Sequence, residues 1–178
     1  MLGQTGISDW RKNWRFWCQI IVCGILPDID SLGFHLGIPY SSFWGHRGIT
    51  HSLAFAAVLA ICLATGFSRT LRPPWMLALL LFFVTATHGL LDAMTDGGLG
   101  VAFLSPFDLQ RYFLPWRPIH VSPMGVGRFF SARGLRILWS EIVWVWLRVL
   151  GIWALVKAAQ MLRRLWIKPT EVLNTTSD

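Results

Sequence analysis

The sequence predicts an all-α protein that spans a membrane, and two observations lead to this prediction. The first is composition, since hydrophobic residues make up 54% of the 178 residues and charged residues only 14%, whereas soluble domains carry about 25% charge. The second is that several of the eleven tryptophans lie near the ends of apolar runs, where an indole ring suits the membrane interface. We therefore expect a polytopic helical bundle with about four membrane-embedded helices and a long ordered loop between the third and the fourth.

Four apolar segments carry this expectation, at residues 14–26, 50–67, 75–94 and 135–162. The first is short, because a perpendicular span requires about 20 residues. Thr50 is a plausible N-cap for the second segment, and Pro73 and Pro74 suit the start of the third. The fourth is interrupted by Glu141 and Arg148, which predicts a long helix with a polar stripe.

The length fits one membrane-embedded domain over residues 1–168, followed by a polar tail at 169–178, which we expect to be disordered. The net charge of +7 comes from Lys and Arg residues that flank the apolar segments. This placement favours anionic membrane lipid as a partner and argues against nucleic acid, which would require a continuous basic surface.

The polar residues that could carry chemistry lie at the ends of these segments. With alternating crossings, the end of the first segment, the start of the second and the end of the third meet at one membrane face. Ionisable groups at this depth are rare unless they are functional. The residues concerned are Asp28, Asp30, His46, His51, His88 and Asp92.

These six residues predict a divalent metal site. His88 and Asp92 are four residues apart, so both project from one face of a helix and can reach a common ion. Imidazoles together with carboxylates suit Zn²⁺ first, with Mn²⁺ or Fe²⁺ as alternatives. Such a site can activate water for hydrolysis, and Asp28 or Asp30 could accept the proton.

Two further residues are candidates for the catalytic machinery. Arg47 lies between two predicted ligands, where its guanidinium could clamp a phosphate or carboxylate of a substrate, or it could be a surface arginine at headgroup level. Glu141 could support a ligand histidine, or it could pair with Arg136 or Arg148.

Three motifs resemble, in order and spacing, those of the YdjM/YbcI-like family of inner-membrane, metal-dependent hydrolases: LPDID at 26–30, GHRGITHS at 45–52 and HGLLDAMTDGGLGVAFLSPF at 88–107. The resemblance implies a multi-pass protein of the bacterial inner membrane that holds a divalent metal at the six His and Asp positions. Members of that family also carry a histidine near the N-terminus. Here the first histidine is His35, which predicts either a divergent or shortened start or a site with one ligand fewer.

The favoured hypothesis is a membrane-bound hydrolase that acts on an ester or phosphoester of a lipid or envelope molecule. The alternative is a non-catalytic scaffold or transporter-like protein, in which the same polar cluster holds the helices together. The sequence leaves the substrate, the oligomeric state and the membrane face of the site open.

Overall fold

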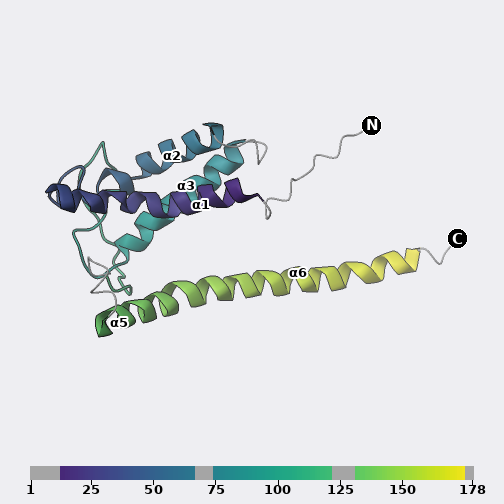
Figure 1. The fold of residues 1–178 in the computed structure, drawn as a ribbon. Coiled ribbons are helices and arrows are strands. Elements are labelled where there is room, and N and C mark those ends of the chain that lie inside the picture. Colours follow the sequence, from purple (N-terminus) through teal and green to yellow (C-terminus); the bar gives the residue numbers. More distant parts are fainter. Residues whose placement is uncertain (1–12, 67–73, 122–130, 175–178) are drawn as a thin grey trace. The chain divides into compact units, whose positions relative to one another are not determined.

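The computed structural model describes residues 13–66, 74–121 and 131–174. The chain forms two compact units, residues 1–117 and 118–178 (Figure 1). Two such units can belong to one membrane domain, so the single domain expected over residues 1–168 stays a prediction. The described part is helical and contains no strand beyond an isolated bridge between Val101 and Tyr112, which confirms the predicted all-α class.

The first helix, α1, spans Trp14–Ile25 and is capped by Asn13, whose side chain accepts from the Arg15 and Phe16 N–H groups. The helix extends past residue 26, where the predicted segment ended, and continues as the 3₁₀ helix η2, Leu26–Leu36. Pro27 lies in the first turn of η2, a position where prolines are tolerated. The combined helix, 14–36, is long and apolar enough to cross a membrane.

Helix α2 spans Leu53–Gly66 and follows the short 3₁₀ helix η3, Ile49–His51. Thr50 is therefore not its N-cap. Ser52 supplies the capping oxygen, which accepts from the Phe55 N–H at 3.0 Å. The 14 residues of α2 reach about 21 Å, less than the ~30 Å thickness of the hydrocarbon core, so a fourth membrane-embedded helix is not confirmed.

Helix α3, Pro74–Ala93, is a candidate span and packs against both α1 and α2. Alanines spaced four residues apart on α2 let the two backbones come close, as small residues do between membrane helices. The core contains Phe16, Cys23, Ala60, Ala64, Leu77 and Leu81. Many apolar side chains on the other faces are exposed, which suits helices surrounded by lipid.

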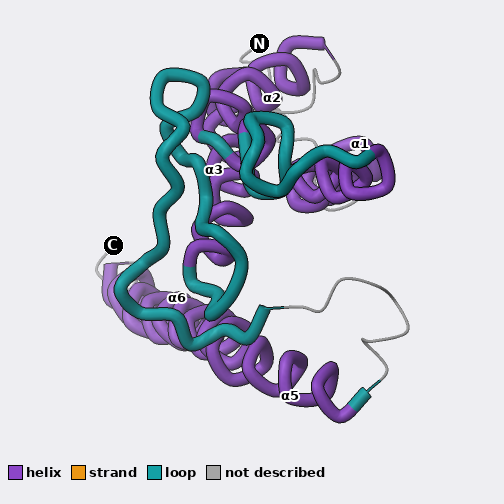
Figure 2. The backbone as a smooth tube through the Cα atoms, turned by 90° about the vertical axis from the view of Figure 1, so that its left-hand side faces the viewer, coloured by secondary structure: helices purple, strands orange, loops and turns teal. Residues whose placement is uncertain are grey.

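The predicted ordered loop follows α3, and its residues 94–121 are drawn in teal in Figure 2, whereas residues 122–130 lie outside the described residues. The Leu114 N–H bonds the carbonyl of Ala93 at 2.9 Å, and the Phe103 carbonyl accepts from the Leu53 N–H at the start of α2. These bonds hold the loop against the ends of α2 and α3.

The second unit contains α5 (Ala132–Glu141), the π-helix η4 (Ile142–Trp146) and α6 (Leu147–Asn174), which are continuous. Residues 134–163 form the third candidate span. The predicted disorder of residues 169–178 is wrong in part, because α6 continues into this polar stretch and ends at Asn174.

Candidate metal centre

The six His and Asp residues predicted at one membrane face lie together in the first unit. The 3₁₀ helix η2 carries Asp28 and Asp30, and the last turns of α3 carry His88 and Asp92. His46 lies in the turn before η3, and His51 ends η3. The six residues divide into two groups that share His51, one with Asp28, His88 and Asp92 and the other with Asp30 and His46.

The first group joins two imidazoles and two carboxylates around a common point. Nε2 of His51 lies 3.1 Å from Oδ2 of Asp92 and 3.6 Å from Oδ1 of Asp28. Nε2 of His88 lies 3.3 Å from the same oxygen of Asp28 and 4.0 Å from Oδ2 of Asp92. All four potential ligand atoms lie within 4.8 Å of one another.

The other ring nitrogen of each histidine faces an acceptor that holds the ring in place. Nδ1 of His88 lies 2.8 Å from the carbonyl of Gly24 in α1. A carbonyl only accepts, so Nδ1 carries a proton, while Nε2 faces the carboxylate of Asp28 at 3.3 Å. Nδ1 of His51 similarly faces Oδ2 of Asp30 at 3.1 Å. Metal-binding histidines in proteins are held in this way, with one nitrogen on a carbonyl or carboxylate and the other free for the ion.

The residues fit a cation for a further reason. Nε2 of His51 and Oδ2 of Asp92 are buried and accept or donate no hydrogen bond among the described residues, although they lie 3.1 Å apart. Two buried acceptors facing each other are unfavourable unless a positive charge lies between them. The groups of this site can therefore bind a metal ion.

A proton is the other cation that could satisfy them. Burial of His51 disfavours its protonated form, but the neighbouring carboxylates of Asp28, Asp30 and Asp92 outweigh burial and raise the pKa of His51 to about 10. A metal ion and this proton compete for the same ring nitrogen.

Asp30 occupies a different position from the other two aspartates. Its Oδ1 lies 2.7 Å from Nδ1 of His46, and its Oδ2 accepts from the Arg47 N–H at 3.1 Å and from the Thr50 hydroxyl. The side chain is buried, and both oxygens already have donors. Asp30 therefore orients His46 and His51 in the arrangement seen here.

The guanidinium of Arg47 does not point outward toward a substrate but is buried. Its Nη2 bonds Oδ1 of Asp92 at 3.1 Å, and its Nη1 bonds the Thr95 hydroxyl at 2.9 Å and the Gly97 carbonyl at 3.0 Å. Arg47 thereby positions Asp92. Glu141 lies at the end of α5 in the second unit, and its part in the site stays a prediction.

The site is open on one side. The side chain of His51 is fully buried, and those of His88 and Asp92 are 18% and 19% exposed, whereas that of Asp28 is 51% exposed. Asp28 therefore forms the solvent-facing edge of the cluster.

Two contributors were missed by the sequence analysis. The first is Thr50, which we assigned to helix capping. It lies between His46 and His51 in the sequence, and its hydroxyl donates to Asp30. The second is Arg111, whose guanidinium donates to the carbonyls of His46 at 2.8 Å, Tyr40 at 2.9 Å and Ser42 at 3.1 Å. No sequence pattern indicates this role, because backbone carbonyls are present at every residue.

Comparison with known proteins agrees with the membrane helices. The family model described as YdjM inner membrane protein matches residues 2–166. The chain is also similar to the inner membrane protein YbcI of Escherichia coli strain K12, with 40% identity over 131 residues that cover 71% of this chain and 74% of the relative. No solved structure matches. The match over nearly the whole chain shows that it belongs to the YdjM family of inner membrane proteins.

Proposed function

We propose that this protein is a membrane-bound, zinc-dependent hydrolase. The observation that carries the proposal is the convergence of Nε2 of His51 and of His88 with the carboxylates of Asp92 and Asp28 around one point. Nitrogen and oxygen donors in this number suit zinc better than Mg²⁺ or Ca²⁺, which prefer oxygen alone. Mn²⁺ and Fe²⁺ are the next candidates.

The buried members of the cluster and its exposed edge have different roles in this proposal. His51, His88 and Asp92 hold the ion, which when bound would polarise a substrate oxygen and lower the pKa of water. Asp28 is the most exposed of the four, so it can accept a proton from the attacking water and pass it to solvent. Arg47 and Asp30 keep the ligands in position through the bonds described above.

The proposed substrate is an ester or phosphoester of a lipid or envelope molecule. The site lies at the ends of apolar helices, and the Ala102 N–H bonds the Arg47 carbonyl beside it at 3.0 Å. The same loop carries Phe107, which is 91% exposed, and the half-exposed Leu104. Exposed apolar side chains next to a polar site suit a molecule with both apolar and polar parts.

Metal analysis of the detergent-purified protein, together with hydrolysis of a panel of lipid esters and phosphoesters, tests the proposal. The wild type should contain about one zinc ion per chain, and His88→Ala should lose it. Asp28→Asn should keep the ion and lose hydrolysis. His35→Ala is the matched control, because His35 is exposed and outside both groups.

The scaffold alternative predicts a different result. In that case the wild type would hydrolyse nothing in the panel, and a chelator would unfold the protein instead of only removing activity. A wild type without bound metal after growth in zinc, manganese and iron would contradict the proposal outright.

A further inference from the structure

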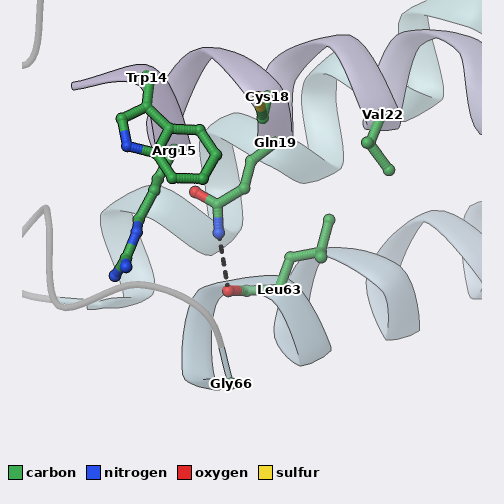
Figure 3. Close-up of a pocket in the computed structure, with 7 residues that line it drawn as sticks. All are labelled: Trp14, Arg15, Cys18, Gln19, Val22, Leu63 and Gly66. Carbon is green, nitrogen blue, oxygen red and sulfur yellow. Dashed lines mark hydrogen bonds between the residues drawn. The ribbon is translucent and has the colours of Figure 1, made fainter. Parts of the chain in front are cut away.

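A groove lies between α1 and α2, near the start of α1 and the end of α2 (Figure 3). It is the opposite end of these helices from the His and Asp cluster, which lies beyond the end of α1 and before the start of α2. Its volume is about 540 Å³, and its walls are mostly apolar, with Cys18, Val22 and Leu63 along its length. Trp14 and Arg15 lie at one end.

One buried polar atom in the groove, Oε1 of Gln19, accepts no hydrogen bond from the part of the chain that the structure describes. Gln19 is 5% exposed, and its Nε2 donates to the carbonyl of Leu63 at 3.0 Å. Figure 3 shows Oε1 of Gln19 turned toward Trp14 and Arg15. A buried acceptor is costly in an apolar environment, so a hydroxyl that reached it would be bound favourably.

The side chains beside Gln19 can admit such a group. Trp14 is 68% exposed, and the guanidinium of Arg15 lies over its ring at 5.6 Å. Tryptophan and arginine at the start of a membrane helix mark the headgroup level, and Arg15 provides the positive charge that a phosphate requires. Exposed side chains can change rotamer at little cost and uncover the oxygen below.

The spacing along α1 indicates what the donor is. Gln19 lies one helical turn beyond Arg15, about 6 Å further from the headgroup level. Terminal headgroup atoms of a lipid lie outside its phosphate, and ester carbonyls of its glycerol only accept hydrogen bonds. A free hydroxyl on the glycerol lies on the inner side of the phosphate and can donate.

The volume of the groove indicates that its ligand has one acyl chain. A methylene group occupies about as much space as a water molecule, ~30 Å³, so the groove holds about eighteen such groups. That is close to one long acyl chain and well below two.

We propose that this groove binds a lysophospholipid, that is, a phospholipid with one acyl chain and a free glycerol hydroxyl. The chain packs along Cys18, Val22 and Leu63, the phosphate pairs with Arg15, and the hydroxyl donates to Oε1 of Gln19. The proposal is independent of hydrolysis at the His and Asp cluster.

Two probes isolate the hydroxyl, namely lysophosphatidylcholine and its 2-deoxy analogue with the same acyl chain, which has the same headgroup and ester but no free hydroxyl. Native mass spectrometry of the full chain in a maltoside detergent measures the affinity for each. One added hydrogen bond corresponds to about a three- to tenfold preference for lysophosphatidylcholine. Gln19→Met should abolish this preference, and Arg15→Gln should lower the affinity for both probes.

Two further measurements guard against misfolding and a second binding mode. Val22→Phe narrows the groove and leaves Gln19 in place, so it should lower the affinity for both probes. His88→Ala should change neither affinity. Equal affinity of the wild type for the two probes would overturn the proposal. So would displacement of lysophosphatidylcholine by an equimolar diacyl phospholipid, or a preference that survives in Gln19→Met.

Discussion

Nε2 of His51 and Oδ2 of Asp92 face each other at 3.1 Å, both buried and neither in a hydrogen bond among the described residues. The two atoms need a cation between them, either a metal ion or the proton of His51. Asp92→Asn removes the negative charge but keeps the shape of the side chain and an oxygen for Arg47. We expect it to lower zinc affinity by at least about 100-fold, more than the loss of a supporting contact. Competition with a fluorescent chelator measures this affinity.

The matched control for that variant is Asp108→Asn, in the loop after α3 and outside the cluster. It should leave zinc affinity unchanged. Equal affinities for Asp92→Asn and wild type would place the ion elsewhere.

The sequence predicted which residues form this centre, but not which aspartate faces which nitrogen of His51. Alternating crossings led us to group the six His and Asp residues, and the structure brings them together, although α2 is not confirmed as a crossing. This grouping could not separate Asp30, which supports His51, from Asp28 and Asp92, which face its other nitrogen. That separation depends on distances within the 3₁₀ helix η2, which lies beyond the end of the first predicted segment.

The fold was predicted with similar limits. Apolar length located α3 and the long final helix correctly, because a membrane span needs a long apolar run. The sequence overestimated the length of α2, because Thr50 resembles a helix cap but bonds Asp30 instead. Arg111 escaped prediction altogether, since its partners are backbone carbonyls.

Metal binding should release a proton. The three surrounding aspartates raise the pKa of His51 from 6.5 to about 10 against the opposing effect of burial. The metal-free site therefore holds a protonated His51 near neutral pH, and an ion must displace that proton. Calorimetric titration of zinc in buffers with different ionisation enthalpies should show release of about one proton from this ring. Heats that do not depend on the buffer would contradict this.

The same shift predicts how stability depends on pH in the metal-free protein. The pKa of His51 is higher in the folded than in the unfolded state, so its contribution is complete below pH 6.5 and is lost as the pH rises toward 10. Thermal unfolding with excess chelator should show a falling Tm over this range. The zinc-loaded protein should show a smaller fall, because the ion replaces the proton.

Thr50 should support metal binding through Asp30. Thr50→Val keeps the branched shape but removes the hydroxyl that donates to Asp30, which loosens the carboxylate that orients His51. We expect a loss of about tenfold or more in zinc affinity, as is usual for such supporting contacts. Thr50→Ser retains the hydroxyl and should bind zinc nearly as well as the wild type. If the two variants behave alike, the hydroxyl has no part in the site.

Gly98 should be required for the position of Arg47. It has a φ of +87°, and a Cβ added there would lie 2.6 Å from the Tyr40 hydroxyl and 3.0 Å from Nη1 of Arg47. Gly37 has a similar φ of +73° but open space around it, so alanine there tests the backbone strain alone. Both alanine variants should lose about 1–2 kcal/mol of stability from the left-handed conformation. Only Gly98→Ala should also lower zinc affinity, because it displaces the guanidinium that holds Asp92. Chemical denaturation and zinc titration of the two variants separate these effects, and an unchanged zinc affinity in Gly98→Ala would show that Asp92 does not depend on Arg47.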